Sequence, residues 1–150
     1  MKIAVYTICL NEEKHVTRWA TSCQEADYRI VADTGSTDTS VCLLQQEGVT
    51  VHDVCIDPWR FDTAKNVALS LVPADADVCI SLDMDAWLPA DWRQHLESVW
   101  QPHHTRMRHS YHYVNAQDEF VRNYPHAKVH SRRGYHWQRC ASRSSASIWF

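Results

Sequence analysis

Acidic side chains follow three of the strands that the sequence predicts. Strands are expected over residues 2–8, 28–32 and 77–82, and the acids after them are Glu12 and Glu13, Asp33 and Asp38, and Asp83 and Asp85. Ligands of open α/β sheets bind beyond the carboxyl ends of the strands, so these side chains are expected at one rim. Crowded carboxylates repel one another unless they share protons or bind a cation. The pattern therefore predicts a site for a divalent metal ion.

Asp83 and Asp85 are the strongest metal-ligand candidates, because they directly follow the apolar run VCISL. In an extended segment, residues two apart point the same way, so both carboxylates can face one ion. Mg²⁺ and Mn²⁺ prefer such oxygen ligands and leave positions open for phosphate oxygens. Taken alone, the D-x-D pattern is also compatible with an ordinary polar strand end before a helix at Pro89.

Two other classes of enzyme share parts of this pattern. The D-T-G-S run at residues 33–36 matches the loop of aspartic proteases, which needs a second copy and an all-β setting. The D-x-D of haloacid-dehalogenase-like phosphatases lies on the first strand and usually continues with Gly-Thr, whereas Ala86-Trp87 follows here. Both readings are disfavoured, because residues 33–36 lead into a helix and three strands precede Asp83.

Alternating periodicities predict the elements that position these residues. Strands are expected over residues 2–8, 28–32, 49–56 and 77–82, and helices after Asn11, over residues 36–47 and 62–71, and after Pro89. Beyond Pro102, strands are expected over residues 107–114, 127–130 and 134–137. The β-α repetition indicates an α/β fold with a mostly parallel central sheet flanked by helices.

Charge is distributed unevenly along the chain, whose net charge is −3. Residues 1–102 carry 16 acidic and 7 basic side chains, while residues 103–150 carry 8 basic and 2 acidic ones and seven of the ten histidines. The acidic part argues against a nucleic-acid partner. The two parts either clamp a polyanion together with a metal or simply pack against each other, and charge alone favours packing.

Cysteine and hydropathy patterns indicate a cytoplasmic protein without an integral membrane segment. No apolar run approaches the roughly 18 residues that a membrane span needs. The six cysteines lie at least 13 residues apart, so reduced, mostly buried thiols are expected rather than disulfides or a zinc ribbon. His103, His104, His109 and His112 also lack zinc-site spacing.

Five short motifs together resemble family 2 glycosyltransferases. They are Leu10-Asn11-Glu12-Glu13, VADTGSTD at residues 31–38, FDTAKN at 61–66, LDMD at 82–85 and RRGYHW at 132–137. Their order and approximate spacing agree with that family over about residues 2–138. The resemblance implies a Rossmann-like, three-layer nucleotide-diphospho-sugar transferase fold of the GT-A type over residues 1–138, followed by an irregular tail over residues 139–150.

The resemblance also implies a role for individual residues. Asp33 would accept the imino proton of a uracil-type base, with Asn11 and Glu12 at the border of that pocket. Lys65 would contact the base or the diphosphate, Asp83 the ribose or a metal-bound water, and Asp85 an Mn²⁺ or Mg²⁺ ion. The expected nucleotide-sugar-binding residues are Thr7, Asn11, Glu12, Asp33, Gly35, Lys65 and Asp83, with Asp85 as the metal ligand.

The implied activity is metal-dependent, inverting transfer of a sugar from a nucleotide-diphosphate donor, with a UDP-sugar favoured, to a hydroxyl of a saccharide or another acceptor. Family members generally continue with a Val-His-Glu-like motif where this chain has Gln138-Arg139-Cys140, so truncation at the C-terminus is expected. No catalytic base is assigned. The alternative is a nucleotide-sugar-binding module with little or no turnover, and a homo-oligomer is possible in either case.

Overall fold

The computed structural model describes residues 1–115, 117–138 and 146–149 of the 150-residue chain. The strands are β1 (Ile3–Cys9), β2 (Tyr28–Asp33), β3 (Thr50–Asp53), β4 (Val78–Ser81), β5 (Ala86–Trp87), β6 (Arg106–Val114), β7 (Phe120–Ser131) and β8 (Ala146–Trp149). The helices are α1 (Glu13–Ser22), α2 (Ser40–Gln46), α3 (Phe61–Ser70) and α4 (Trp92–Val99). The predicted α/β class is confirmed.

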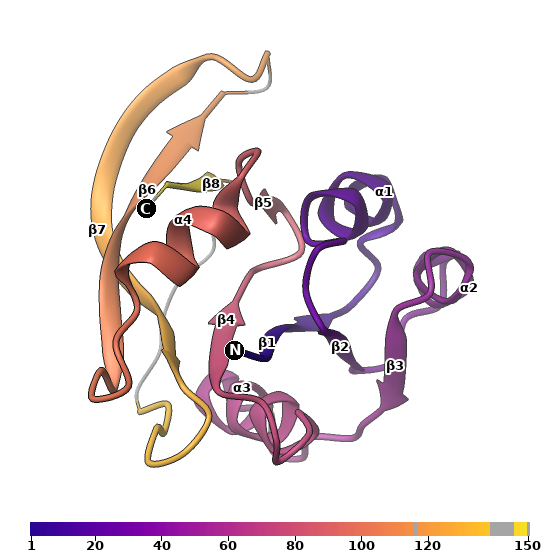
Figure 1. The fold of residues 1–150 in the computed structure, drawn as a ribbon. Helices are drawn as coiled ribbons and strands as arrows, with labels where there is room; N and C mark the ends of the chain where they lie inside the picture. Colours follow the sequence, from indigo (N-terminus) through magenta and orange to yellow (C-terminus); the bar gives the residue numbers. More distant parts are fainter. Residues whose placement is uncertain (116, 139–145, 150) are drawn as a thin grey trace.

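The strands form one mixed sheet in the order β3-β2-β1-β4-β7-β6-β8-β5. The pairs β3–β2, β2–β1 and β1–β4 are parallel, so the carboxyl ends of these four strands share one edge. From β7 onward the pairing is antiparallel until β8, which runs parallel to β5. Strands β6 and β7 form a long, bent hairpin at one side of the molecule (Figure 1).

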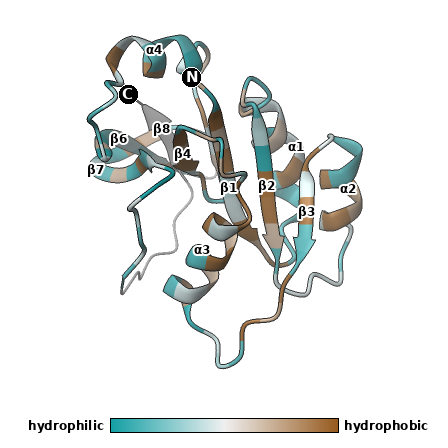
Figure 2. Cartoon of the chain, turned by 60° about the horizontal axis from the view of Figure 1, so that its bottom comes forward, coloured by the Kyte–Doolittle hydropathy of each residue, from teal (hydrophilic) through white to brown (hydrophobic). Residues whose placement is uncertain are grey.

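Two hydrophobic layers hold helices against the two faces of the sheet. Trp19 of α1, Leu44 of α2 and Leu96 of α4 pack with one face, and each is fully buried. Ala68 of α3 packs with Ala4 on the opposite face. Figure 2, coloured by residue hydropathy, shows hydrophobic residues along the central strands and hydrophilic residues on parts of the helices. The arrangement has the three predicted layers.

Several predicted boundaries were wrong, two of them because a side chain hydrogen-bonds to backbone distant in sequence. Helix α2 begins at Ser40 rather than Ser36, because the Asn11 side chain accepts hydrogen bonds from the backbone of residues 37 and 38. Residues 134–137 form no strand; both backbone groups of Trp137 bond instead to the Asn66 amide, at 2.9 Å each. The helix after Pro89 begins only at Trp92, since Asp91 takes a left-handed conformation.

The expectation that residues 139–150 are irregular does not hold for Ala146–Trp149. These residues form β8, which pairs with β6 on one side and β5 on the other. An edge strand exposes unpaired backbone groups, and β8 satisfies those of β6. Residues 139–145 and 150 lie outside the described part, so the predicted domain boundary at residue 138 stays a prediction.

The cysteines agree only in part with the prediction of reduced, mostly buried thiols. Cys9, Cys23 and Cys79 are buried free thiols, as predicted, whereas Cys42 and Cys55 are free and exposed. Cys140 lies outside the described residues. No helix in the described part of the chain is long and apolar enough to span a membrane.

A series of largely buried hydrogen bonds holds the segment after β7 against the face of the sheet that α3 covers. Trp137 Nε1 donates to the Tyr6 hydroxyl at 2.6 Å, and His130 Nδ1 lies 2.8 Å from the Ser131 carbonyl. Since a carbonyl only accepts, Nδ1 carries the proton and His130 Nε2 accepts from the Tyr6 hydroxyl at 2.9 Å. Tyr135 stacks on His130 at 3.6 Å between ring centroids. His130 is therefore a neutral, structural residue.

We expect His130 to make stability fall at acid pH. Burial lowers the pKa of His130 to about 4, so between its unfolded value near 6.5 and about 4 the unfolded state binds the proton more tightly. This contribution is complete above pH 6.5 and is lost as the pH falls toward 4, by about 1.4 kcal/mol for each unit. Urea unfolding from pH 8 to pH 4 of the wild type and His130→Gln measures it.

The variant should lose less stability than the wild type over the acid part of that range, although it is less stable at pH 8. Parallel pH profiles for the two proteins would contradict a neutral His130.

Candidate functional site

A cleft of about 480 Å³ opens at the carboxyl edge of the parallel strands. Thr7 and Cys9 of β1 line it from one side, and Asp83 and Asp85, which follow β4, line it from another. Glu12, at the start of α1, adds a third carboxylate. The parallel register places the ends of β1 and β4 side by side, which is why residues some seventy positions apart share one cavity.

Asp83 is clamped between two lysines that come from opposite directions. Lys65 of α3 donates to Asp83 Oδ1 at 2.6 Å and to the Ser81 hydroxyl at 3.0 Å. Lys128 of β7 binds Asp83 Oδ2 and lies with its ammonium 4.4 Å from the centre of the Tyr111 ring. Burial opposes ionisation of Asp83, but the two ammonium groups outweigh it and hold its pKa well below the usual range.

Asp85 experiences the opposite electrostatics. Burial, together with the negative charges of Asp83 and Glu12, raises the pKa of Asp85 to about 6. A carboxylate in such surroundings is stabilised by a cation. Among the described residues no group of three or more His, Cys, Asp and Glu side chains is arranged to hold a metal ion. Mg²⁺-type sites, however, often use one or two carboxylates and take their other ligands from substrate phosphates. Asp85 and Glu12 fit such a partial ligand set.

Asn11 and Asp33 hold a loop beside the cleft, next in sequence to the lining residues Leu10, Glu12 and Thr34. The Asp33 carboxylate accepts bonds from the backbone N–H groups of Gly35 and Ser36, at 3.1 and 2.9 Å, and from the Ser36 hydroxyl. Asn11 Oδ1 accepts from the Thr37 N–H at 2.7 Å. These contacts join the end of β1 to the end of β2. Their predicted contact with a base stays a prediction.

Gly35 makes the turn after β2 possible. Its φ of +109° is a conformation that residues with a side chain adopt only with strain. Space is not the constraint, because a β-carbon built on Gly35 would meet no atom within 4 Å. The turn brings the N–H groups of residues 35 and 36 onto Asp33.

Sequence reasoning missed two residues of this region. Lys128 is 8% exposed and binds Asp83. Its strand was predicted, but its side chain was not assigned a role. Asn66 anchors Trp137 through its side-chain amide. A lysine inside the otherwise uncharged run YPHAKVH is the available signal for Lys128. Trp59, 54% exposed, and Phe61 add aromatic walls to the cleft.

Comparison with solved structures identifies the fold. The structure of TarS residues 1–349 from S. aureus superposes with a TM-score of 0.56 and 20% identity, over 65% of this chain and 32% of TarS. The structure of its complex with UDP-GlcNAc superposes with a TM-score of 0.53 and 19% identity, over 65% of this chain and 30% of TarS. The chain has the GT-A glycosyltransferase fold. The predicted resemblance to these glycosyltransferases is thus confirmed for the fold.

The match to GT-A structures is partial in length. This chain spans about a third of the solved structures that it matches, including glucosyl-3-phosphoglycerate synthase from Mycobacterium tuberculosis, with 25% identity, a TM-score of 0.48 and coverage of 56% and 33%. No protein-family profile matches the sequence, and no curated protein matches it.

The clamp around Asp83 predicts strong energetic coupling between its members. Removing Asp83 alone leaves two buried ammonium groups facing each other, whereas removing Lys128 as well relieves that repulsion. In a double-mutant cycle of Asp83→Asn and Lys128→Met, the double variant should be more stable than the sum of the single losses predicts, by roughly 1 kcal/mol or more. Urea unfolding at neutral pH measures the three variants.

Arg18→Met with Asp118→Asn, an ion pair at 2.9 Å with both side chains largely exposed, is the matched control cycle. Its coupling is expected below about 1 kcal/mol. Additive effects of the Asp83 and Lys128 substitutions would contradict the clamp.

Proposed function

We propose that the cleft binds a nucleotide-diphosphate sugar, with a UDP-sugar favoured, and that the chain transfers the sugar to an acceptor hydroxyl with the help of a divalent cation. The observation that carries this proposal is the clamped, ionised Asp83 beside Asp85 at the carboxyl edge of the sheet. Ligands of open α/β sheets bind at that edge. The S. aureus TarS structure with UDP-GlcNAc has the same fold, which supports this class of donor.

Asp83 is suited to bind a sugar hydroxyl of the donor. An ionised carboxylate has about four acceptor positions. Lys65 and Lys128 each occupy one oxygen, so positions on both oxygens remain for a ribose hydroxyl. The two lysines also place positive charge behind the carboxylate, which favours the approach of a diphosphate.

Asp85 would hold an Mn²⁺ or Mg²⁺ ion, with Glu12 nearby. Such an ion would supply Lewis-acid chemistry, stabilising the negative charge on the leaving nucleotide. The raised pKa of Asp85, at about 6, is consistent with a side chain that needs a neighbouring cation.

Asp33 and Thr7 are proposed to border the base. Asp33 already accepts three hydrogen bonds from its own loop, and about one acceptor position on Oδ1 remains for an imino N–H. Thr7 is fully buried and is one of the residues that line the cleft. Exposed Trp59 offers a ring on which a base or sugar can stack.

In the proposed inverting transfer, the acceptor oxygen bonds to the anomeric carbon as the bond from that carbon to the diphosphate breaks. The acceptor proton passes to a base, and the nucleoside diphosphate leaves. Glu12, Asp83 and Asp85 are the carboxylates that line the cleft, and each has another role above. This observation favours the second candidate, a module that binds the donor with little turnover. Release of sugar or transfer to an acceptor, measured beside UDP binding, separates the two.

Asp85→Asn should weaken Mn²⁺-dependent UDP binding by roughly tenfold or more, equivalent to about 1.4 kcal/mol. The amide keeps the size of the side chain but loses the charge that attracts the ion. Isothermal titration calorimetry with UDP, with and without Mn²⁺, measures the effect, and thermal unfolding verifies that the variant is folded.

Asp53→Asn is the matched control, since Asp53 is exposed at the end of β3 and does not line the cleft. It should bind like the wild type. Equal Mn²⁺-dependent affinity in folded Asp85→Asn would refute the metal role of Asp85.

A further inference from the structure

One side of the β6–β7 hairpin carries a continuous row of rings and cations, here called the hairpin stripe. Its members are Tyr111 and Tyr113 of β6 and Arg122, Tyr124, His126 and Lys128 of β7. The β7 members alternate along the strand, so they share one face of it. The register places Tyr113 opposite Arg122 and Tyr111 opposite Tyr124.

Contacts between neighbours make the stripe continuous. The Arg122 guanidinium lies 5.4 and 5.2 Å from the ring centres of Tyr113 and Tyr124. The Tyr113 hydroxyl lies 3.2 Å from His126 Nε2, and the rings of His126 and Tyr111 are 4.8 Å apart. Each ring thus holds the next in place.

The inner end of the stripe reaches the candidate donor site. Lys128 contacts both the Tyr111 ring and the Asp83 carboxylate, which lines the cleft. Exposure decreases in the same direction: Tyr124 is 48% exposed, Tyr113 and His126 are partly buried, and Tyr111 is fully buried. From Arg122 to Lys128 the strand rises about 20 Å, enough for several linked sugar rings.

Arg122 gives the outer end a free positive charge. Among the described residues it forms no ion pair, whereas Arg18, Arg60 and Arg93 each pair with an acid. Two tyrosine rings hold its guanidinium instead, through cation–π contacts. The planar fork of its N–H groups remains suited to a carboxylate or phosphate. The surrounding segment, residues 103–150, is basic overall, with 8 basic and 2 acidic side chains.

We propose that the hairpin stripe binds the acceptor of the transfer reaction and that this acceptor is an acidic saccharide chain. Tyrosine rings offer flat faces against which sugar rings pack, while Arg122 pairs with an acidic group of the chain. The stripe guides one end of the saccharide toward Asp83 and the donor. This inference rests on the proposed function, because it names the second substrate of the same site.

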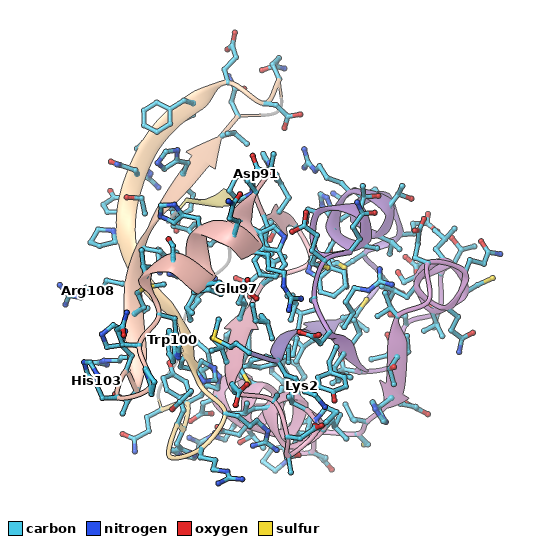
Figure 3. All side chains as sticks on the ribbon, viewed as in Figure 1. Lys2, Asp91, Glu97, Trp100, His103 and Arg108 are labelled. Atoms are coloured by element: carbon cyan, nitrogen blue, oxygen red, sulfur yellow. The ribbon has the colours of Figure 1, made fainter. Side chains whose placement is uncertain are left out.

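Hexagalacturonic acid serves as the acidic probe and maltohexaose as the neutral one, each titrated into the full chain at low salt. Arg122→Ser and Tyr124→Ala remove exposed stripe members, so they are expected to leave the fold intact, which thermal unfolding verifies. Arg108→Ser is the matched control, because Arg108 is exposed on the same hairpin and points away from the body of the molecule in Figure 3.

Hexagalacturonic acid should bind the wild type and Arg108→Ser alike, and each stripe variant about fivefold more weakly. Maltohexaose should bind more weakly than the acidic probe. Lack of binding to the wild type, an equal loss in Arg108→Ser, or equal affinity for both probes would overturn the proposal. So would sedimentation showing a dimer that the stripe variants dissociate, since the stripe would then be a contact between two copies.

UDP binding with Mn²⁺, measured on the same samples, keeps the two proposals distinguishable. The stripe variants should bind UDP like the wild type. If the wild type binds UDP but does not bind hexagalacturonic acid, the acceptor role of the stripe is overturned and the proposed function is not. Probe binding without any UDP binding would overturn the proposed function and, with it, the acceptor role of the stripe.

Discussion

Asp83 and the two lysines that clamp it bring a helix, the end of a central strand and a hairpin to one point. Lys65 comes from a helix on one face of the sheet, Asp83 follows a central parallel strand, and Lys128 comes from the antiparallel hairpin. Each charge is largely removed from water, which is costly unless opposite charges lie within hydrogen-bond distance. Burial of these three charges therefore depends on the helix, the strand end and the hairpin meeting at this point.

The same clamp separates the electrostatic behaviour of two carboxylates only two residues apart. Asp83 receives both ammonium groups and stays ionised, whereas Asp85 faces Asp83 and Glu12 and resists ionisation. Neighbouring carboxylates of one motif thus differ in how readily they ionise, which fits the different partners proposed for them. One suits a neutral hydrogen-bond donor such as a hydroxyl, and the other suits a cation.

Polar residues at the other strand ends mainly organise backbone. Asn11 and Asp33 accept hydrogen bonds from the turn after β2, and Asn66 holds Trp137 in an extended segment. Buried backbone N–H and carbonyl groups need partners, and side-chain amides and carboxylates supply them where no strand or helix does. The loops at the rim of the sheet are thus bonded to one another through side chains.

The sequence alone determined the α/β class, the alternation of the first four strands with helices, and the gathering of acids at one edge. The first two follow from periodicities within short stretches of chain, and the third from the general rule that parallel strands end at one edge of the sheet. The predicted helix start at residue 36 and the strand at residues 134–137 failed because contacts with Asn11 and Asn66 decide them, and the pairing of Ala146–Trp149 with β6 was not predicted. Local pattern carries no information about such partners.

The candidate site shows the same division. Asp83 and Lys65 were predicted as site residues, but their contact with each other depends on how α3 packs on the sheet. The contribution of Lys128 depends on the antiparallel pairing of β4 with β7. The two lysines stand 63 positions apart in the chain. Only the tertiary structure decides which distant charges meet, because a buried charge takes the partner that packing brings within reach.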